Sequence, residues 1–238
     1  MRAPARISMV IAALDEAASL PELLERLRAA LRDFPKTEFL IVDDGSTDGT
    51  FDVLRKLART EPRIRAFQLA TNVGSQRALL LGLEKARGDV MICIDADLQQ
   101  PPELLPRMIS AWGEGFDVVH MVRTGRGGES LARTLATSAF YRAFNLISAV
   151  HVTPDAADFK LLDRSCVDQL IAKRPLFLRA GVHALQVKQT ELTYEAATRR
   201  HGESRYTARR LIKAGLEALL PLRLQRSVPE PKIIAVIP

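Results

Sequence analysis

The chain has little cysteine and no long hydrophobic run. Cys93 and Cys166 are the only cysteines among its 238 residues, and neither belongs to a Cys-x-x-Cys motif or a Cys/His cluster. A disulfide framework and a structural zinc site are therefore not expected, and a reducing compartment such as the cytoplasm is indicated. No segment reaches the roughly 20 consecutive apolar residues of a membrane-spanning helix, so the sequence predicts no span.

Aromatic residues are also few, at 5% of the chain, and the basic residues are concentrated in one half. Residues 1–122 contain 15 Lys and Arg against 18 Asp and Glu, whereas residues 123–238 contain 19 against 10. We expect the first half to hold a cation and the second half to meet anions such as phosphates or anionic lipids. Proteins that bind nucleic acid typically place aromatic side chains among basic ones, and this chain lacks that footprint, so no nucleic acid is predicted as its partner.

Apolar runs and amphipathic stretches alternate regularly through the first half of the chain. This alternation predicts an α/β fold with a mainly parallel sheet flanked by helices. The predicted strands are residues 7–13, 37–45, 64–70, 89–95 and 116–123, and the predicted helices are residues 19–33, 47–60, 75–87 and 101–112. Farther along, the patterns predict a strand and then a helix over residues 155–173, and an exposed strand over residues 185–196.

Acidic residues follow three of these strands, as Asp15-Glu16, Asp43-Asp44 and Asp95-Ala96-Asp97. The carboxyl ends of parallel strands meet at one edge of a sheet, where α/β proteins bind their ligands. Side chains two residues apart share a face of an extended backbone, so Asp95 and Asp97 could share Mg²⁺ or Mn²⁺ together with diphosphate oxygens. The alternative is a pair of surface acids in a turn.

The acids of the second strand end run into a glycine turn and the start of a helix. Short polar side chains in such a turn often accept hydrogen bonds from backbone amides, and we expect this role for Ser46 and Asp48. For Asp44 we favour a contact with a nucleotide, because it lies at the strand end itself.

Longer stretches of the sequence carry a family resemblance that runs from residue 7 to about residue 215. The stretches occur in the order DADLQQPPEL, VVHMVRTGR, ESLARTLATSAFYRAFNLIS, DAADFKLLDR and RRHGESRY. The series resembles glycosyltransferase family 2, the inverting nucleotide-sugar enzymes of the GT-A fold. Within that family it is similar to the dolichyl-phosphate and polyprenyl-phosphate hexosyltransferases. The resemblance implies transfer of a hexose from a nucleotide-diphosphate sugar to a polyprenyl phosphate.

The same resemblance implies roles for individual residues. Asp97, Asp158 and Arg123 become the catalytic residues, and a metal ion, Mg²⁺ or Mn²⁺, is assigned to Asp95, Asp97 and Gln99. An acceptor phosphate is already ionised, so positioning and stabilisation of the leaving diphosphate should matter more than a strong general base. The substrate-binding residues implied by the resemblance, or by their guanidinium chemistry, are Ala12, Leu14, Glu16, Asp44, Asp95, Gln99, Arg126, Arg133, Arg199 and Ser204.

Two of these assignments have plain structural alternatives. Asp158 could be a structural acid paired with Lys160 or Arg164, and the arginines after residue 122 could form a solvated basic loop. The sequence also departs from the family pattern where a lysine often follows Asn-x-Gly, because Ser75-Gln76-Arg77 follow Gly74 here.

A basic amphipathic pattern covers residues 204–220, with apolar residues on one stripe and Arg205, Arg209 and Lys213 opposite. Such a helix can lie in the interface of a membrane that contains anionic lipid. We therefore divide the chain into a GT-A domain over residues 1–203, a basic amphipathic helix suited to an interface over residues 204–220 and a proline-containing tail over residues 221–238. The expected location is peripheral, on the inner face of the membrane, with a homo-oligomer possible.

Three other functions compete with transfer to a lipid. A transferase of the same family could act on a soluble sugar or a protein hydroxyl. A nucleotidyltransferase also uses paired acids and a metal, but residues 8–20 lack the glycine-rich basic loop that it would need. A basic nucleic-acid-binding domain without catalysis is the third alternative, and acids at successive strand ends favour an enzyme instead.

Overall fold

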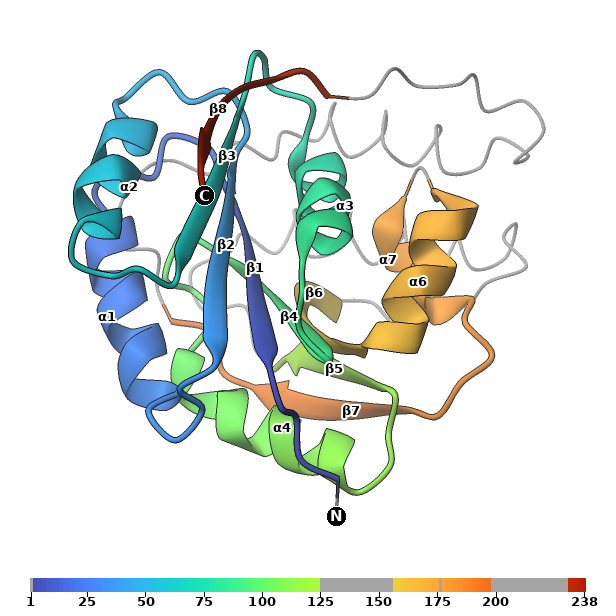
Figure 1. The fold of residues 1–238 in the computed structure, drawn as a ribbon. Coiled ribbons are helices and arrows are strands. Elements are labelled where there is room, and N and C mark those ends of the chain that lie inside the picture. The colour runs from blue at the N-terminus through green and yellow to red at the C-terminus, as the bar shows by residue number, and fades with distance from the viewer. Residues whose placement is uncertain (1, 125–155, 176, 198–230) are drawn as a thin grey trace.

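The computed structural model describes residues 2–124, 156–175, 177–197 and 231–238, with eight strands in one mixed sheet (Figure 1). The sheet order is β7-β5-β6-β4-β1-β2-β3-β8. The strands are β1 Ile7–Ala13, β2 Thr37–Asp43, β3 Ile64–Leu69, β4 Val90–Asp95, β5 Val118–Arg123, β6 Ala156–Asp163, β7 Gln189–Tyr194 and β8 Ile233–Ile237. The helices are α1 Leu20–Ala30, α2 Thr50–Ala58, α3 Ser75–Lys85, the 3-10 turn η1 Pro102–Leu104, α4 Leu105–Gly113, α6 Arg164–Lys173 and α7 Leu178–His183.

Four parallel strands, in the order β4-β1-β2-β3, form the middle of the sheet. On one side β6 pairs antiparallel with both β4 and β5, and β7 then pairs parallel with β5. Every strand predicted in the first half is present, with ends that agree to within two residues. The predicted α/β fold with flanking helices is therefore confirmed.

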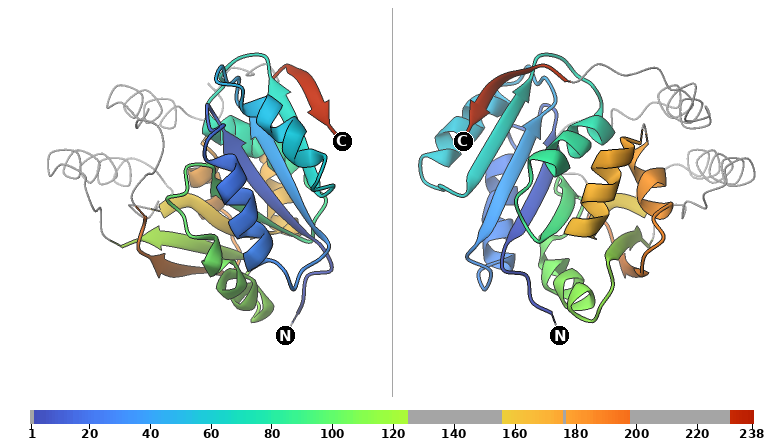
Figure 2. Two further views of the ribbon diagram at one scale, coloured as in Figure 1. Left: turned by 90° about the vertical axis from the view of Figure 1, so that its left-hand side faces the viewer. Right: turned by 45° about the vertical axis from the view of Figure 1, so that its right-hand side comes forward.

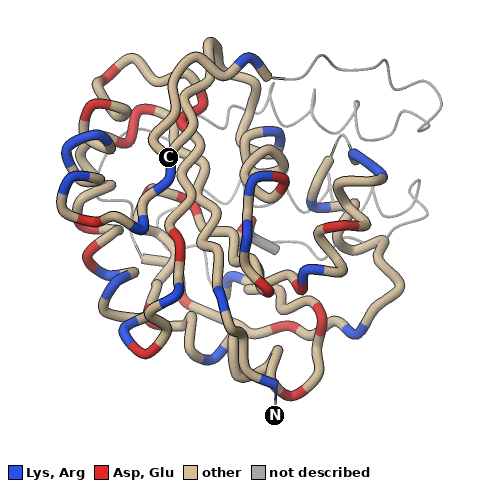
Figure 3. Tube along the Cα trace, viewed as in Figure 1, with Lys and Arg blue, Asp and Glu red and all other residues tan. Residues whose placement is uncertain are grey.

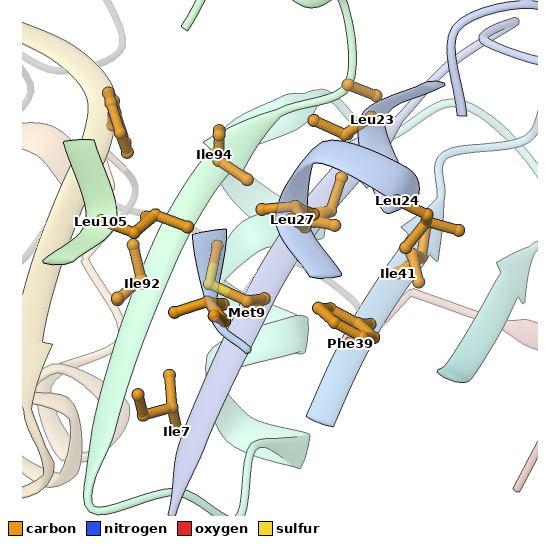
Figure 4. Packing of buried hydrophobic residues seen from close by; sticks show 14 of the residues in the cluster. Ile7, Met9, Leu23, Leu24, Leu27, Phe39, Ile41, Ile92, Ile94 and Leu105 are labelled. Atoms are coloured by element: carbon orange, nitrogen blue, oxygen red, sulfur yellow. The ribbon is translucent and has the colours of Figure 1, made fainter. Parts of the chain in front are cut away.

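The helices cover both faces of the sheet, as the two views of Figure 2 show. One core lies between the sheet and α1, α2 and α4, and the other lies between the sheet and α3, α6 and α7. In the first core, Leu23, Leu24 and Leu27 of α1 pack over Met9 and Phe39 of the sheet (Figure 4). Strands β1, β2 and β4 are nearly continuous apolar runs because both of their faces are covered.

The last residues of the chain form a strand where the sequence pattern predicts only a tail. β8 pairs antiparallel with β3 at the edge of the sheet, and Ala235 and Ile237 pack against the first core. Its apolar, β-branched composition suits a pleated edge. The run is only five residues long and follows prolines, so periodicity alone did not identify it.

Some predicted features lie outside the described residues. They are Arg126, Arg133, Arg199, Ser204 and the helix predicted over residues 204–220. Among the residues that the structure describes, no helix combines the length and apolar character needed to span a bilayer.

Candidate active site

The three acidic strand ends meet at one edge of the sheet. β1 lies between β2 and β4, and its last residues pair across to both, with Ala13 opposite Asp43 and Ala12 opposite Asp95. The backbone N–H of Asp44 donates to the carbonyl of Ala13 at 2.8 Å, which keeps the two chains together beyond the strands. The predicted gathering of acids at the carboxyl edge is therefore present in the structure.

The loop after β2 is held by its own acids and by those that follow β1. Asp43 accepts a hydrogen bond from the Ser46 N–H at 3.0 Å, and Asp15 accepts one from the Thr47 N–H at 2.7 Å. Asp48 accepts from the Thr50 N–H at 2.9 Å, and Ser46 accepts from the Asp15 N–H at 2.9 Å. Ser46 and Asp48 therefore accept backbone amides as expected, but Ser46 does so from the loop after β1, and α2, with Gly49 at its N-cap, has no side-chain cap.

Asp44 links this loop to the one that precedes α3. Its buried carboxylate accepts the Val73 N–H at 2.7 Å and the Gly74 N–H at 3.0 Å. Burial raises the pKa of Asp44, and the two amide donors oppose that rise. Asp44 therefore fixes the loop through residue 74, and its contact with a nucleotide base stays a prediction.

The loops approach so closely that one residue between them must be glycine. Gly45 has φ of +75°, and a Cβ placed there would lie 2.7 Å from the Thr71 carbonyl carbon and 2.8 Å from the Asn72 nitrogen. Any other side chain would push the two loops apart.

A tight turn places Asp95 and Asp97 beside each other after β4. Leu98 adopts φ of 62°, unusual for a residue with a side chain, and such backbone strain is often found at functional sites. The Asp95 N–H donates to the side-chain oxygen of Gln100 at 2.9 Å, and the Gln100 amide donates to Asp95 Oδ2 at 2.6 Å. Asp97 Oδ1 accepts the Gln99 N–H at 3.1 Å.

This arrangement leaves one oxygen of each acid for a ligand. Within the described residues, Asp95 Oδ1 and Asp97 Oδ2 accept no hydrogen bond. Desolvation raises the pKa of Asp95 to about 8, and the negative charges of Asp97 and Asp158 add to the rise. Two neighbouring carboxylates with open oxygens, that of Asp95 with a raised pKa, fit a hard divalent cation.

The cation would need further ligands from outside these two acids. No group of three or more Asp, Glu, His or Cys side chains that could enclose a metal occurs among the described residues. Water and phosphate oxygens commonly complete such a shell for Mg²⁺. The structure gives Gln100 the contact with Asp95, whereas Gln99 holds Asp97 through its backbone, and a metal contact by the Gln99 side chain stays a prediction.

Asp158 of β6 lies in a buried network with two cations and an amide. Lys160 Nζ lies 3.3 Å from Asp158 Oδ1, and Arg179 NH2 of α7 lies 3.1 Å from Oδ2. Gln76 of α3 donates its amide to Oδ2 and accepts the backbone N–H of Arg179 at 3.2 Å. Burial alone would raise the pKa of Asp158, but Arg179 and Lys160 outweigh it and lower that pKa below its ordinary value.

The structure distinguishes the two partners considered for Asp158. Lys160 is a partner, whereas Arg164 instead donates to the carbonyls of Gly88 and Ala86 and pairs with Asp168. An ionised Asp158 therefore stays in place without any substrate. Its pairing gives it a structural role and does not exclude a role toward the sugar.

The pKa of Tyr194 is affected by burial, by the Asp95 and Asp97 carboxylates and by Arg123. Tyr194 stands opposite Arg123 in the pairing of β7 with β5, and its ring packs edge-to-face on Phe159 at 5.8 Å. Burial is the largest cause that raises the pKa of Tyr194, and Asp95 and Asp97 raise it further while Arg123 lowers it. The charges of Asp95, Asp97 and Arg123 therefore all act on the hydroxyl of Tyr194. Arg123 Nε is buried and has no partner within the described residues.

The remaining predicted residues within the described part of the chain lie at the end of β1 and in the loop after it. Glu16 is buried and accepts the Ser19 hydroxyl at 2.6 Å, and Ala12 and Leu14 are half-buried beside it. Sequence reasoning gave no active-site role to Gln76, Gln100, Lys160, Arg179 or Tyr194. The signals available were two departures from the family pattern, at residues 75–77 and directly after Arg179, where Ala180-Gly181 replaces the usual aromatic-glycine pair.

Comparison with known proteins agrees with this geometry. Residues 8–171 match the profile of the family described as Glycosyl transferase family 2. YkcC, an uncharacterized glycosyltransferase of Bacillus subtilis (strain 168), is 32% identical over 215 residues, which cover 89% of this chain and 67% of YkcC. The undecaprenyl-phosphate 4-deoxy-4-formamido-L-arabinose transferase of Pseudomonas fluorescens (strain SBW25) is 35% identical over 227 residues, which cover 92% of this chain and 66% of that protein.

A solved structure shares the fold. The glucosyl-3-phosphoglycerate synthase from Mycobacterium tuberculosis, in complex with Mn²⁺, uridine-diphosphate-glucose and phosphoglyceric acid, matches with a TM-score of 0.59 and 22% identity. The match covers 90% of this chain and 77% of that one. The chain spans about two thirds of the length of the two relatives named above.

Proposed function

The chain belongs to glycosyl transferase family 2, and we propose that it transfers a hexose from a nucleotide-diphosphate sugar to a polyprenyl phosphate, with inversion. The observation that carries the proposal is that Asp44, Asp95 and Asp97 lie at the carboxyl ends of β2 and β4, the two strands that flank β1 on the same edge of the sheet. The undecaprenyl-phosphate transferase that matches 92% of the chain supports a lipid phosphate as acceptor.

The donor diphosphate would bind at Asp95 and Asp97. Asp95 and Asp97 would hold a divalent cation, Mg²⁺ or Mn²⁺, which would supply positive charge to stabilise the leaving diphosphate. The Mn²⁺ bound in the Mycobacterium tuberculosis neighbour supports this cofactor. The base would lie toward Asp44 and Glu16, between the loops that follow β1 and β2.

The remaining charged residues would align the acceptor with the sugar. Arg123, with its buried Nε unpaired in the described part of the chain, is suited to a planar contact with a phosphate oxygen. Lys160, Arg179 and Gln76 hold the carboxylate of Asp158 in one position. Asp158 would therefore orient the sugar without first changing its own conformation. An ionised phosphate attacks without giving up a proton, so this network need not supply a base.

The acceptor lipid places the reaction at a membrane surface. We propose peripheral attachment on the inner face of the membrane, through the basic stretch of residues 204–220, which lies outside the described residues. Arg126, Arg133, Arg199 and Ser204 would then serve the acceptor side. A homo-oligomer is compatible with this arrangement.

An acceptor panel tests the proposal. Purified protein with Mn²⁺ is offered radiolabelled UDP- and GDP-hexoses together with undecaprenyl phosphate, dolichyl phosphate or soluble sugars in detergent. We expect label in the lipid phase only, and an Asp97→Ala variant should abolish it. Label that appears only in soluble products would replace this proposal with a family 2 transferase for soluble acceptors.

A further inference from the structure

A pocket lies at the opposite edge of the sheet from the acids, at the amino ends of the four parallel strands. Its volume is about 400 Å³. Its walls come from Arg6 before β1, Lys36 and Glu38 at the start of β2, Arg63 and Arg65 at the start of β3, and Arg87 before β4. Strands of six or seven residues, at roughly 3.3 Å per residue, separate this edge from the candidate active site by about 20 Å.

Most of the charged side chains around this pocket are positive. Elsewhere acidic and basic residues are mixed, as on α1 and α2 (Figure 3). Five cations line the pocket against the Glu38 side chain and, in the 1–238 chain, the terminal carboxylate of Pro238. Glu61 neutralises Arg63 through two contacts of 2.8 Å. With Glu38, Glu61 and the Pro238 carboxylate counted, the pocket keeps a net charge of +2.

The Glu38 carboxylate holds Arg65 and the backbone of Arg87 in place. Its hydrogen-bond acceptor positions are largely occupied, so it cannot neutralise all of the remaining cations. It is buried, and it accepts hydrogen bonds from the Ser8 hydroxyl, from the backbone N–H of Arg87 at 2.7 Å and from Arg65 at 2.9 Å. Burial alone would raise the pKa of Glu38, but these donors outweigh it, so the pKa is lowered and the group is ionised. Arg65 also donates to the Lys85 carbonyl at 3.0 Å, which further restricts its guanidinium.

Two cations at the mouth of the pocket stay unpaired. Within the described residues, the side chains of Lys36 and Arg87 make no hydrogen bond or ion pair, and both are exposed. Arg87 is held at its backbone by Glu38 and by the Ser8 hydroxyl. Its guanidinium therefore projects from a fixed point beside the pocket, which reduces the entropy lost when an anion binds.

We propose that this pocket binds a small polyanion of the diphosphate class, separately from the candidate active site. A compact anion with two or more negative charges offsets the net positive charge of the lining, and a guanidinium group can bind two phosphate oxygens at once. A membrane surface fits less well, because docking at this edge would turn the acids at the carboxyl edge away from the bilayer. The site goes beyond the proposed transfer reaction and does not depend on it.

Calorimetric titration with inorganic pyrophosphate tests the site. The 1–238 chain is first stripped of metal and then dialysed into metal-free buffer without chelator, so that metal-assisted binding at Asp95 and Asp97 is removed and no other polyanion competes. We expect one binding event, which weakens as salt screens the charges. Lys36→Ala and Arg87→Ala should each weaken it at least about tenfold, and monophosphate should bind more weakly than pyrophosphate.

Matched controls distinguish binding in this pocket from binding at other cations of the protein. Lys188→Ala and Arg107→Ala remove exposed cations that do not line the pocket, and Arg123→Ala alters the candidate active site. Lys188→Ala and Arg107→Ala should bind pyrophosphate within about twofold of the wild type, whereas Arg123→Ala reports whether the ion binds at the candidate active site instead. Absence of binding in the wild type would overturn the proposal, as would equal losses in the controls or a loss confined to Arg123→Ala.

Vesicle sedimentation distinguishes a soluble phosphate ligand from a lipid headgroup. Sedimentation with phosphatidylglycerol vesicles should be unaffected by Lys36→Ala and Arg87→Ala. If these variants lose vesicle binding while the wild type fails to bind pyrophosphate, the hollow is a membrane contact and the proposal is wrong.

Discussion

At the scale of single residues, the unusual group is Asp95, whose pKa is raised to about 8 by desolvation and by two neighbouring acids. Its proton stabilises the metal-free fold at low pH, and that contribution is lost as the pH rises through about 8. A cation must displace this proton, so Mn²⁺ affinity should rise about tenfold per pH unit between roughly pH 6 and 8.

Titration of Mn²⁺ followed by electron paramagnetic resonance measures this dependence. Asp97→Ala is the matched control, because it removes one ligand and one of the charges that raise the pKa of Asp95. The variant should bind Mn²⁺ more weakly, with a flatter pH profile. A profile that is flat in the wild type would show that Asp95 is not the titrating ligand.

Gln76 is the second residue whose contacts imply a measurable effect. Gln76→Glu puts a carboxylate where an amide now donates to Asp158 and receives the Arg179 N–H. Loss of a hydrogen bond to a charged group typically costs about 1.5–3 kcal/mol, so kcat should fall roughly tenfold to a hundredfold. The KM for the donor should change less, because Gln76 contacts Asp158 and not Asp95 or Asp97.

Steady-state kinetics with the donor identified by the acceptor panel would test Gln76. Gln76→Met, which keeps the length of the side chain without adding charge, should be impaired less than Gln76→Glu. Equal kcat values for Gln76→Glu and wild type, with both proteins folded, would make the network purely structural.

At the scale of the elements, the site depends on loops that hold one another. Asp44 joins the loop after β2 to the loop before α3 through the amides of Val73 and Gly74. Asp44→Asn would set an amide N–H₂ against one of these N–H donors. We expect the free energy of unfolding to fall by about 1–3 kcal/mol.

Denaturant unfolding checks the value, with Asp52→Asn as control. Asp52 is an exposed acid on α2 that pairs with Arg55 at 3.1 Å, and its substitution should change stability by less than about 0.5 kcal/mol. If Asp44→Asn is as stable as the control, the two loops are joined by other contacts.

At the scale of the whole molecule, the basic half should bring the protein to anionic membranes. Each Lys or Arg near such a surface contributes about 1 kcal/mol, and salt weakens the contribution. Sedimentation with phosphatidylglycerol vesicles should therefore fall with salt and with charge reversal at Arg205, Arg209 and Lys213. Reversal of Arg55, Lys56 and Arg59 on the acidic half should leave it unchanged, and an equal fall in both would indicate attraction to net charge alone.

The sequence by itself determined the parallel centre of the sheet and the edge that carries the acids. Strands β1, β2 and β4 are nearly continuous apolar runs because both faces are covered, so periodicity and the acids at their ends were enough to predict them. The turn roles of Ser46 and Asp48 also followed from local chemistry, since their partners lie nearby in a compact loop or at the end of β1.

Only the tertiary structure decided which side chains complete the site. Arg179 and Gln76 reach Asp158 across 21 and 82 residues of sequence, and no local pattern predicts such a meeting. The choice of Gln100 over Gln99 depends on the left-handed turn at Leu98, and β8 depends on the free edge of β3. Local propensity fixes the elements, whereas long-range packing fixes which polar groups face one another, because burial leaves each of them few partners.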